Sequence, residues 1–241
     1  MTALLEIASL SKSFRGLKAV QNVTFSVPRG EIFAVIGPNG AGKTTLFNMI
    51  AGAFRPDTGT ITFAGARTNG LRPDEVCRLG VGRTFQIVRP FPALTVHDNV
   101  VVGALLHQHD TVLASKRAHE IMRQLGLHDK RDSIAASLTL PDRKRLEVAR
   151  ALATDPKLLL LDEVMAGLRP TETDRMVEIL RELNRGGLTI VLIEHVMRAV
   201  MALAQRVLVL HHGETIAQGQ PAQVVRDPAV VKSYLGTEAV T

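Results

Sequence analysis

The last third of the chain alternates between short apolar runs and segments with apolar residues at helical spacing. The apolar runs contain almost no polar position, which is typical of strands that are covered on both faces of a parallel sheet. The pattern predicts strands at residues 158–161, 189–193 and 207–210 and helices at residues 171–183 and 195–204. This alternation of strand and helix indicates a parallel α/β sheet.

The N-terminal third contains strand-like runs that are separated by clusters of Pro, Gly and Asp, which favour turns. It predicts strands at residues 4–8, 20–27, 32–36 and 60–63. From about residue 95 to residue 152 the apolar spacing becomes helical, as in residues 118–127, where a glycine lies near the end. We therefore expect residues 1–88 and 153–241 to form the core and about 89–152 to form an inserted helical lobe.

Residues 37–45 fit the phosphate-binding template G-x-x-x-x-G-K-[ST] without a gap. The stretch consists of Gly37, Pro38, Asn39, Gly40, Ala41, Gly42, Lys43, Thr44 and Thr45. The glycines let the backbone N–H groups point inward around an anion, Lys43 can reach the outer phosphates, and the Thr44 hydroxyl can ligate Mg²⁺. A predicted strand precedes the loop and a helix start follows it, so the segment predicts a nucleoside-triphosphate site rather than a chance glycine-rich turn.

Two carboxylates follow the apolar strand at residues 158–161. Asp162 would lie at the carboxyl end of a parallel strand beside the phosphate loop, where Mg²⁺ needs an oxygen ligand. Glu163 would then be able to accept a proton from the attacking water as a general base. The alternative is that the pair merely caps a helix at the end of the strand.

The bulk composition narrows the class of protein without identifying it. Of 241 residues, 46% are hydrophobic and 22% are charged, as in globular proteins, and no apolar run is long enough to span a bilayer. The first residues lack the pattern of an export signal, and Cys77 is the only cysteine, which favours a cytosolic location. The net charge of +6 comes from scattered basic residues, the densest group being residues 143–145, interpreted as a solvated helix face. Without aromatic–basic interleaving, we expect no nucleic-acid partner.

The order of these motifs resembles that of the ATP-binding subunits of ABC transporters, over nearly the whole chain. The resemblance implies a P-loop NTPase (RecA-like) core with an N-terminal antiparallel β subdomain and an inserted α-helical subdomain. Phe14 lies where the family stacks an aromatic ring on adenine, and Gln86 matches the glutamine that senses Mg²⁺ and faces the transmembrane partner. His195 matches the histidine that contacts the γ-phosphate, and residues 166–170 occupy the position of the D-loop. Singly, each of these residues is also compatible with a structural or surface role.

The resemblance also implies substrates, cofactors and partners. ATP and Mg²⁺ would be bound, a second ATP-binding subunit would complete the site, and transmembrane permease subunits with a solute-binding protein would hold the chain at the cytoplasmic face of the inner membrane. Residues 82–86, 94–100 and 233–236 look like the LivG branch of the family, which powers import of branched-chain amino acids. Close relatives of that branch serve urea and other small solutes.

The chain departs from the family at its signature motif, LSGGQ in the usual form. The corresponding residues are Leu138–Asp142, so both glycines are missing. Pro141 lacks an N–H donor, although it suits the first position of a helix, and the charge of Asp142 should repel a phosphate. Val164 replaces the proline that usually follows the Asp-Glu pair. We expect one competent and one weak ATP site in a heterodimer, unless Thr139 and backbone adjustment suffice.

Two other classes of function compete with an importer ATPase. A regulatory module that binds ATP without hydrolysing it is favoured by the altered signature and opposed by Lys43, Asp162, Glu163 and His195. A soluble ABC-type ATPase of DNA repair or translation usually carries long coiled-coil insertions or tandem cassettes, and this chain has neither. Phosphate release that is abolished by Glu163→Gln would separate hydrolysis from mere binding.

Overall fold

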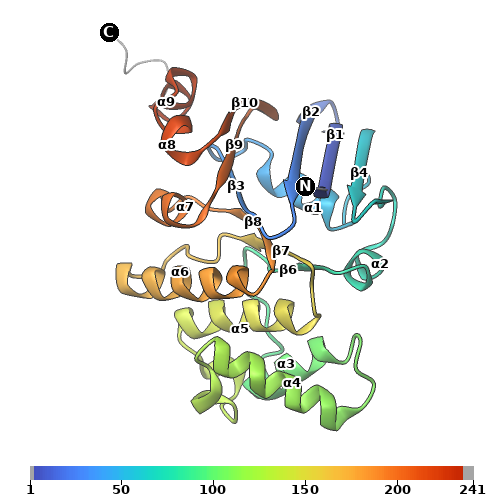
Figure 1. Ribbon diagram of the computed structural model, residues 1–241, viewed down its shortest axis with the longest axis vertical. Helices are drawn as coiled ribbons and strands as arrows, with labels where there is room; N and C mark the ends of the chain where they lie inside the picture. The colour runs from blue at the N-terminus through green and yellow to red at the C-terminus, as the bar shows by residue number, and fades with distance from the viewer. Residues whose placement is uncertain (1–2, 236–241) are drawn as a thin grey trace.

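The computed structural model describes residues 3–235 of the 241, and its strands form two sheets (Figure 1). A six-stranded sheet has the order β10-β9-β3-β8-β7-β6, and a four-stranded sheet has the order β2-β1-β4-β5. The strands are β1 (Ala3–Phe14), β2 (Leu17–Pro28), β3 (Ile32–Ile36), β4 (Thr58–Phe63), β5 (Ala66–Arg67), β6 (Val81–Arg83), β7 (Leu158–Asp162), β8 (Thr189–Ile193), β9 (Arg206–His211) and β10 (Glu214–Gly219).

The larger sheet is parallel except for its edge strand β10, which pairs antiparallel with β9. Every residue of β3, β7 and β8 is buried, because helices or the second sheet cover both faces. The prediction of a parallel α/β core from uninterrupted apolar runs is therefore confirmed. The carboxyl ends of β3 and β7, from which the phosphate loop and the Asp-Glu pair follow, lie at the same edge of this sheet.

The smaller sheet is antiparallel, as the resemblance implied, and its first strand is longer than the predicted 4–8. Strand β1 continues through the polar residues after Ala8 to Phe14, because β2 and β4 supply backbone partners on both sides. Its register shifts between Ile7 and Leu10, where Ser9 has a φ of 49°. This irregularity interrupts the alternation of hydrophobic and polar residues, so the second half of the strand could not be predicted from that alternation.

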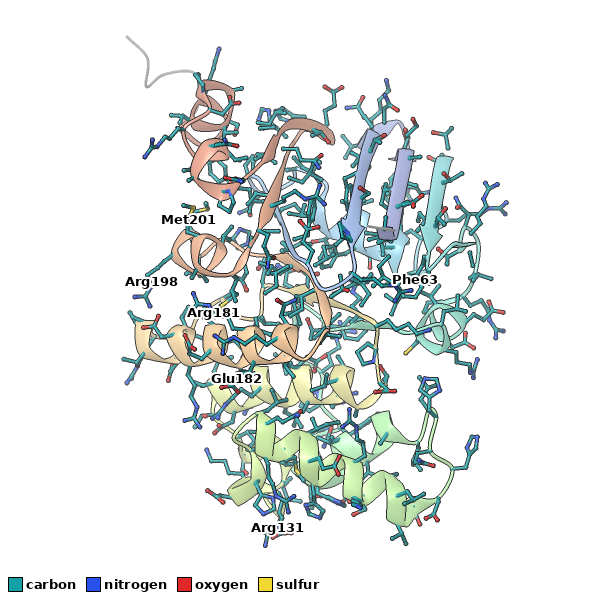
Figure 2. All side chains as sticks on the ribbon, in the orientation of Figure 1. Phe63, Arg131, Arg181, Glu182, Arg198 and Met201 are labelled. Carbon is teal, nitrogen blue, oxygen red and sulfur yellow. The ribbon has the colours of Figure 1, made fainter. Side chains whose placement is uncertain are left out.

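The residues from about 95 to 152, where the apolar spacing is helical, form several separate helices rather than a single long one. The helices are α1 (Lys43–Ile50), α2 (Pro73–Arg78), α3 (Val96–Ala104), α4 (Thr111–Gln124), η1 (His128–Lys130), η2 (Ala135–Ser137), α5 (Leu140–Ala153), α6 (Pro170–Arg185), α7 (Met197–Leu203), α8 (Pro221–Val224) and α9 (Pro228–Leu235). The predicted helix at 195–204 is shorter, and His195 lies in the loop before it. Figure 2 labels Arg181 on α6, whose guanidinium donates to the carbonyl of Ala202 on α7 at 2.8 Å.

Two hydrophobic clusters lie on opposite faces of the larger sheet. Strand β3 contributes Ile32, Ala34 and Ile36 to the cluster under the helices. It contributes Phe33 and Val35 to the cluster shared with α1 and the smaller sheet. Helices α3 to α5 lie together at the end of the molecule farthest from α9 (Figure 1), and α5 also packs on the sheet. Because α5 belongs to both groups, the subdomain boundary near residue 152 stays a prediction.

Candidate nucleotide-binding and catalytic site

The phosphate loop connects β3 to α1 and requires glycine at specific positions. Gly37, Gly40 and Gly42 have φ values of 148°, 78° and 101°. A Cβ atom on Gly37 would lie 2.1 Å from the carbonyl oxygen of Leu210, and one on Gly42 would lie 2.2 Å from that of Ala19. Both contacts are with backbone and cannot relax easily, so the loop keeps its shape only with glycine there. The motif therefore forms a compact turn before helix α1, and the binding of an anion by its N–H groups stays a prediction.

Lys43 is the first residue of α1 and is almost completely buried. Its ammonium group donates to the carbonyl oxygens of Gly37 at 2.7 Å and Pro38 at 2.9 Å. Burial lowers the pKa of Lys43, while the carboxylates of Glu163 and Asp162 act in the opposite direction. The ammonium is therefore held inside the loop and is electrostatically linked to both predicted catalytic carboxylates.

A cleft of about 610 Å³ opens above the loop. It is lined by Phe14, Leu17, Lys18, Ala19, Gln21, Asn39, Gly40, Ala41, Gly42, Lys43, Thr44, Thr45, Gln86, Glu163 and His212. The structure thus brings most of the predicted nucleotide-binding residues to one cavity, although Phe14, Gln86 and Glu163 are far apart in sequence. Gly37, Pro38, Asp162 and His195 do not form its wall. Lys18, Gln21 and His212 line the cleft and were missed by sequence reasoning.

Phe14 ends β1 at the mouth of the cleft. Its ring is 39% exposed and packs edge-on against Phe54 with centroids 5.2 Å apart. The ammonium of Lys12 lies 5.5 Å from the ring centroid. The ring is thus held from one side while a large part of its surface stays accessible to a flat ligand.

The turn between β9 and β10 fastens the phosphate loop to β2. The backbone N–H of Gly213 donates to the Ala41 carbonyl at 3.1 Å, and that of Gln21 donates to the Gly213 carbonyl at 2.8 Å. The Gln21 amide donates to the carbonyl of His212 at 2.9 Å. His212 and Gly213 have φ values of 48° and 82°, as a tight hairpin turn requires. The His-Gly pair between two strand-like segments was the available sequence signal for this turn.

Glu163 lies at the centre of the predicted catalytic residues. The amide of Gln86 donates to its Oε2 at 3.0 Å, and its Oε1 is hydrogen-bonded to Nε2 of His195. The three side chains come from the loop after β6, the end of β7 and the loop after β8. Adjacent parallel strands therefore bring together residues that were predicted separately. The Glu163 carboxylate is oriented by two neighbours and remains at the wall of the cleft.

Asp162 is the last residue of β7 and is 1% exposed. Within residues 3–235, neither of its buried carboxylate oxygens has a hydrogen-bond partner, and the nearest cation is the Arg83 guanidinium at 3.6 Å. Burial raises the pKa of Asp162, opposed mainly by Arg83. A buried carboxylate with unpaired oxygens suits a hard divalent cation, and Thr44 and Gln86 line the adjoining cleft. The residues present therefore fit Mg²⁺, and Arg83 is a neighbour that sequence reasoning missed.

The signature segment differs from its prediction in the position of Asp142. Its carboxylate is 2% exposed and forms ion pairs with Lys130 and Arg145. It also accepts a hydrogen bond from the Thr139 hydroxyl at 2.7 Å. The expectation that Asp142 presents a repelling charge to phosphate is therefore wrong, because the charge is buried and neutralised. Pro141 is the second helical residue, since α5 begins at Leu140.

The interpretation of residues 143–145 as a solvated face is also wrong for two of the three. Lys144 is 5% exposed, and its ammonium donates to the carbonyl oxygen of Glu163 at 2.8 Å. Arg145 is largely buried against Asp142, and only Arg143 is exposed. Lys144 donates to a distant segment, and Arg145 also donates to the carbonyls of Leu125 and Gly126 outside α5, so the local charge pattern did not reveal their burial.

A phosphate loop between a buried parallel strand and a helix, with a carboxylate pair ending a neighbouring strand, defines a P-loop nucleoside triphosphatase. The family model described as ABC transporter matches residues 20–166, and one described as Branched-chain amino acid ATP-binding cassette transporter matches residues 214–240. Within residues 3–235, no helix is long and apolar enough to cross a membrane.

Curated relatives and a solved structure are similar over nearly the full length. The chain is 40% identical to the high-affinity branched-chain amino acid transport ATP-binding protein LivG of Escherichia coli strain K12, covering 97% of this chain and 98% of the relative. It is 36% identical to BraF of Pseudomonas aeruginosa, whose name has the same wording, with the same coverage. A crystal structure of a nucleotide-free ATP-binding cassette from an ABC transporter superposes with a TM-score of 0.90, at 30% identity, over 98% of this chain and 100% of that chain.

The chain belongs to the ABC transporter family and is an ATP-binding cassette ATPase. This confirms the resemblance that the order of motifs indicated, as well as the predicted fold class and enzyme class. The regulatory module without hydrolysis is not favoured by these relatives.

Proposed function

We propose that the chain is the ATP-hydrolysing subunit of an ABC importer for branched-chain or related amino acids. The observation that carries the hydrolytic role is the Glu163 carboxylate, held by Gln86 and His195 at the wall of the nucleotide cleft. The amino-acid class rests on the names of LivG and BraF and on the match to the branched-chain model at residues 214–240. Part of that stretch, including Gly236 of the predicted branch motif, lies outside the described residues.

In this proposal the predicted site residues have distinct roles. Phe14 stacks on the adenine ring, and the phosphate loop binds the triphosphate through its backbone N–H groups. Lys43 exchanges its carbonyl partners for phosphate oxygens. Glu163 accepts a proton from the attacking water, and His195 orients that carboxylate and donates toward the γ-phosphate as charge develops there.

Mg²⁺ would be held by Asp162, Thr44 and Gln86. When bound, it would neutralise charge on the β- and γ-phosphate oxygens. The buried, unpaired oxygens of Asp162 support this assignment. Before the cation binds, the Arg83 guanidinium partly neutralises the negative charge of the Asp162 carboxylate.

A second ATP-binding subunit would complete the catalytic site, and the permease with its solute-binding protein would hold the chain at the cytoplasmic face of the inner membrane. The loop around Gln86 supports a permease contact there, because Phe85, Ile87 and Phe91 expose 51%, 69% and 42% of their surface. Apolar side chains clustered on a surface loop are typical of a protein interface. Closure of the dimer on ATP and its reopening after hydrolysis would then drive the permease.

The signature segment would give its partner a weakened half-site. The Thr139 hydroxyl is engaged with Asp142, and Pro141 supplies no N–H donor. Replacing Asp142 would break a buried ion cluster, so Pro141→Gly alone is the suitable variant. Faster single-turnover hydrolysis by the complex with Pro141→Gly is expected, and an unchanged rate would rule out the weak half-site.

The function is tested by reconstituting the chain with its co-purifying permease in proteoliposomes. Leucine-loaded solute-binding protein should stimulate multiple-turnover phosphate release and leucine uptake, and Glu163→Gln should abolish both while ATP still binds. Urea offered in parallel serves as the control solute. Co-purification with only soluble proteins, or phosphate release that survives Glu163→Gln, would overturn the proposal.

A further inference from the structure

Two buried charged side chains lie behind Glu163 and have no part in the mechanism above. Lys144 comes from the first half of α5, and Glu194 follows the last residue of β8. They are 5% and 1% exposed, respectively. A buried ammonium or carboxylate costs folding free energy unless it is paired, so both positions call for an explanation.

Lys144, on α5, forms a hydrogen bond with the backbone of Glu163, the predicted general base. Its Nζ donates to the Glu163 carbonyl oxygen at 2.8 Å. That carbonyl also accepts from the Ala166 N–H at 3.2 Å, and the Glu163 N–H donates to the Ile193 carbonyl at 2.9 Å. Both the backbone N–H and the backbone carbonyl of Glu163 are therefore held by hydrogen bonds.

These ties hold an unfavourable conformation. Glu163 has a φ of 52°, in the left-handed region that residues with a Cβ atom rarely adopt. This conformation directs the side chain toward Gln86 and His195. Without the ties, the backbone would relax and the carboxylate would lose its orientation.

Glu194 continues the same network on the other side. Its Oε1 accepts from the Met165 N–H at 2.8 Å, while its buried Oε2 has no hydrogen-bond partner in the part of the chain that the structure describes. Its charge acts favourably on Lys144, as do the charges of Glu163, Asp162 and Glu147. Glu194 thus anchors the segment just after Glu163.

We propose that Lys144 and Glu194 are positioning residues that hold the backbone around Glu163 in its left-handed conformation and thereby orient the carboxylate that activates water. This inference rests on the proposed role of Glu163 as the general base. Because Lys144 belongs to the helix that begins at the signature segment, a shift of α5 is transmitted directly to the Glu163 carbonyl. Engagement of the signature by a partner subunit and alignment of the base are coupled through this one hydrogen bond.

The test measures kcat, KM and nucleotide affinity in the reconstituted transporter. Lys144→Met should lower kcat at least tenfold, with the Kd of a fluorescent ATP analogue changed less than threefold, since the nucleotide is bound elsewhere. Lys144→Arg should restore kcat to within about threefold of the wild type because it keeps a charged donor. Lys116→Met, which removes an exposed lysine from α4, is the matched control and should leave all three values unchanged.

A second variant covers the case in which Lys144→Met fails to fold. Lys144→Met with Glu194→Met replaces both buried charges by apolar side chains, a change that is often tolerated in protein interiors. The double variant should fold, bind ATP and retain the low kcat. A double variant with wild-type kcat, or an Arg variant as slow as the Met variant, would overturn the inference. If the wild-type complex itself shows no turnover, it is the proposed function that fails.

Discussion

Replacing Glu194 by Gln should change how the stability of the protein depends on pH. Burial raises the pKa of this carboxyl from 4.5 to about 7, opposed by the Met165 N–H and supported by the nearby charge of Glu163. The side chain is 1% exposed, so solvent does little to screen the effect. Gln keeps the oxygen that accepts from Met165 but has no proton to lose.

The sign and size of the effect follow from proton linkage. Because the pKa is higher in the folded state, folding is favoured below 4.5 and this contribution is lost as the pH rises through about 7. The rise of the pKa from 4.5 to about 7 means that the unfolding free energy of the wild type is about 3 kcal/mol lower above neutral pH than at acid pH, as far as this one group is concerned. The Gln variant lacks this loss, so the difference in unfolding free energy, variant minus wild type, should rise by about 3 kcal/mol between pH 4.5 and pH 8.

Urea unfolding followed by circular dichroism at several pH values measures this difference. A constant offset from exchanging an oxygen for an NH₂ group cancels, because only the change with pH is compared. Glu182→Gln, at an exposed position on α6, is the control and should give a difference that does not vary with pH. A flat difference for Glu194→Gln would refute the argument that this carboxyl is buried without adequate compensation.

Three further predictions concern the nucleotide cleft and the signature segment. Phe14→Ala should weaken ATP binding about threefold to tenfold in an equilibrium titration, the usual contribution of one aromatic contact, whereas Phe91→Ala, an exposed aromatic residue outside the cleft, should leave it unchanged. Gly37→Ala should lower ATP affinity more than tenfold because its Cβ would lie 2.1 Å from the Leu210 carbonyl oxygen. Gly30→Ala should not, since its Cβ would have no neighbour within 4 Å among the described residues. Asp142→Asn should lower the unfolding free energy by about 2 kcal/mol through loss of two charge-assisted contacts, and an unchanged urea midpoint would contradict this.

The parts of the molecule that follow local rules could be predicted from the sequence. Strand β3, the phosphate loop and the start of α1 are contiguous, so residues 32–50 are enough to predict the order strand, loop and helix. The contacts of the loop with Leu210, Ala19 and Gly213 could not be predicted from that stretch. The strand before Asp162 could also be predicted, because four consecutive leucines are typical of a strand that is buried on both faces of a sheet. The position of Glu163 between Gln86 and His195 depends on the order of β6, β7 and β8. The resemblance to a family indicated the roles of these residues but not the order of the strands.

The remaining features depend on contacts between distant segments. Asp142 looked like an exposed charge because one of its two cationic partners, Lys130, lies on η1 and outside its own helix. Lys144 looked like part of a surface cluster because its partner is a backbone carbonyl beyond the next strand. Charge patterns along one helix cannot distinguish an ammonium in water from one that is buried against the backbone.

Strand β3 lies between the two hydrophobic clusters and contributes side chains to each. Ile32, Ala34 and Ile36 belong to one cluster, and Phe33 and Val35 belong to the other. Neither cluster can be lost without exposing a face of this strand. The two halves of the molecule should therefore unfold together, and the amides of β3 should be among the last to exchange with solvent. Since the phosphate loop follows directly from Ile36, a nucleotide that binds only the folded chain should raise the unfolding free energy of both halves together, by an amount set by its concentration and Kd.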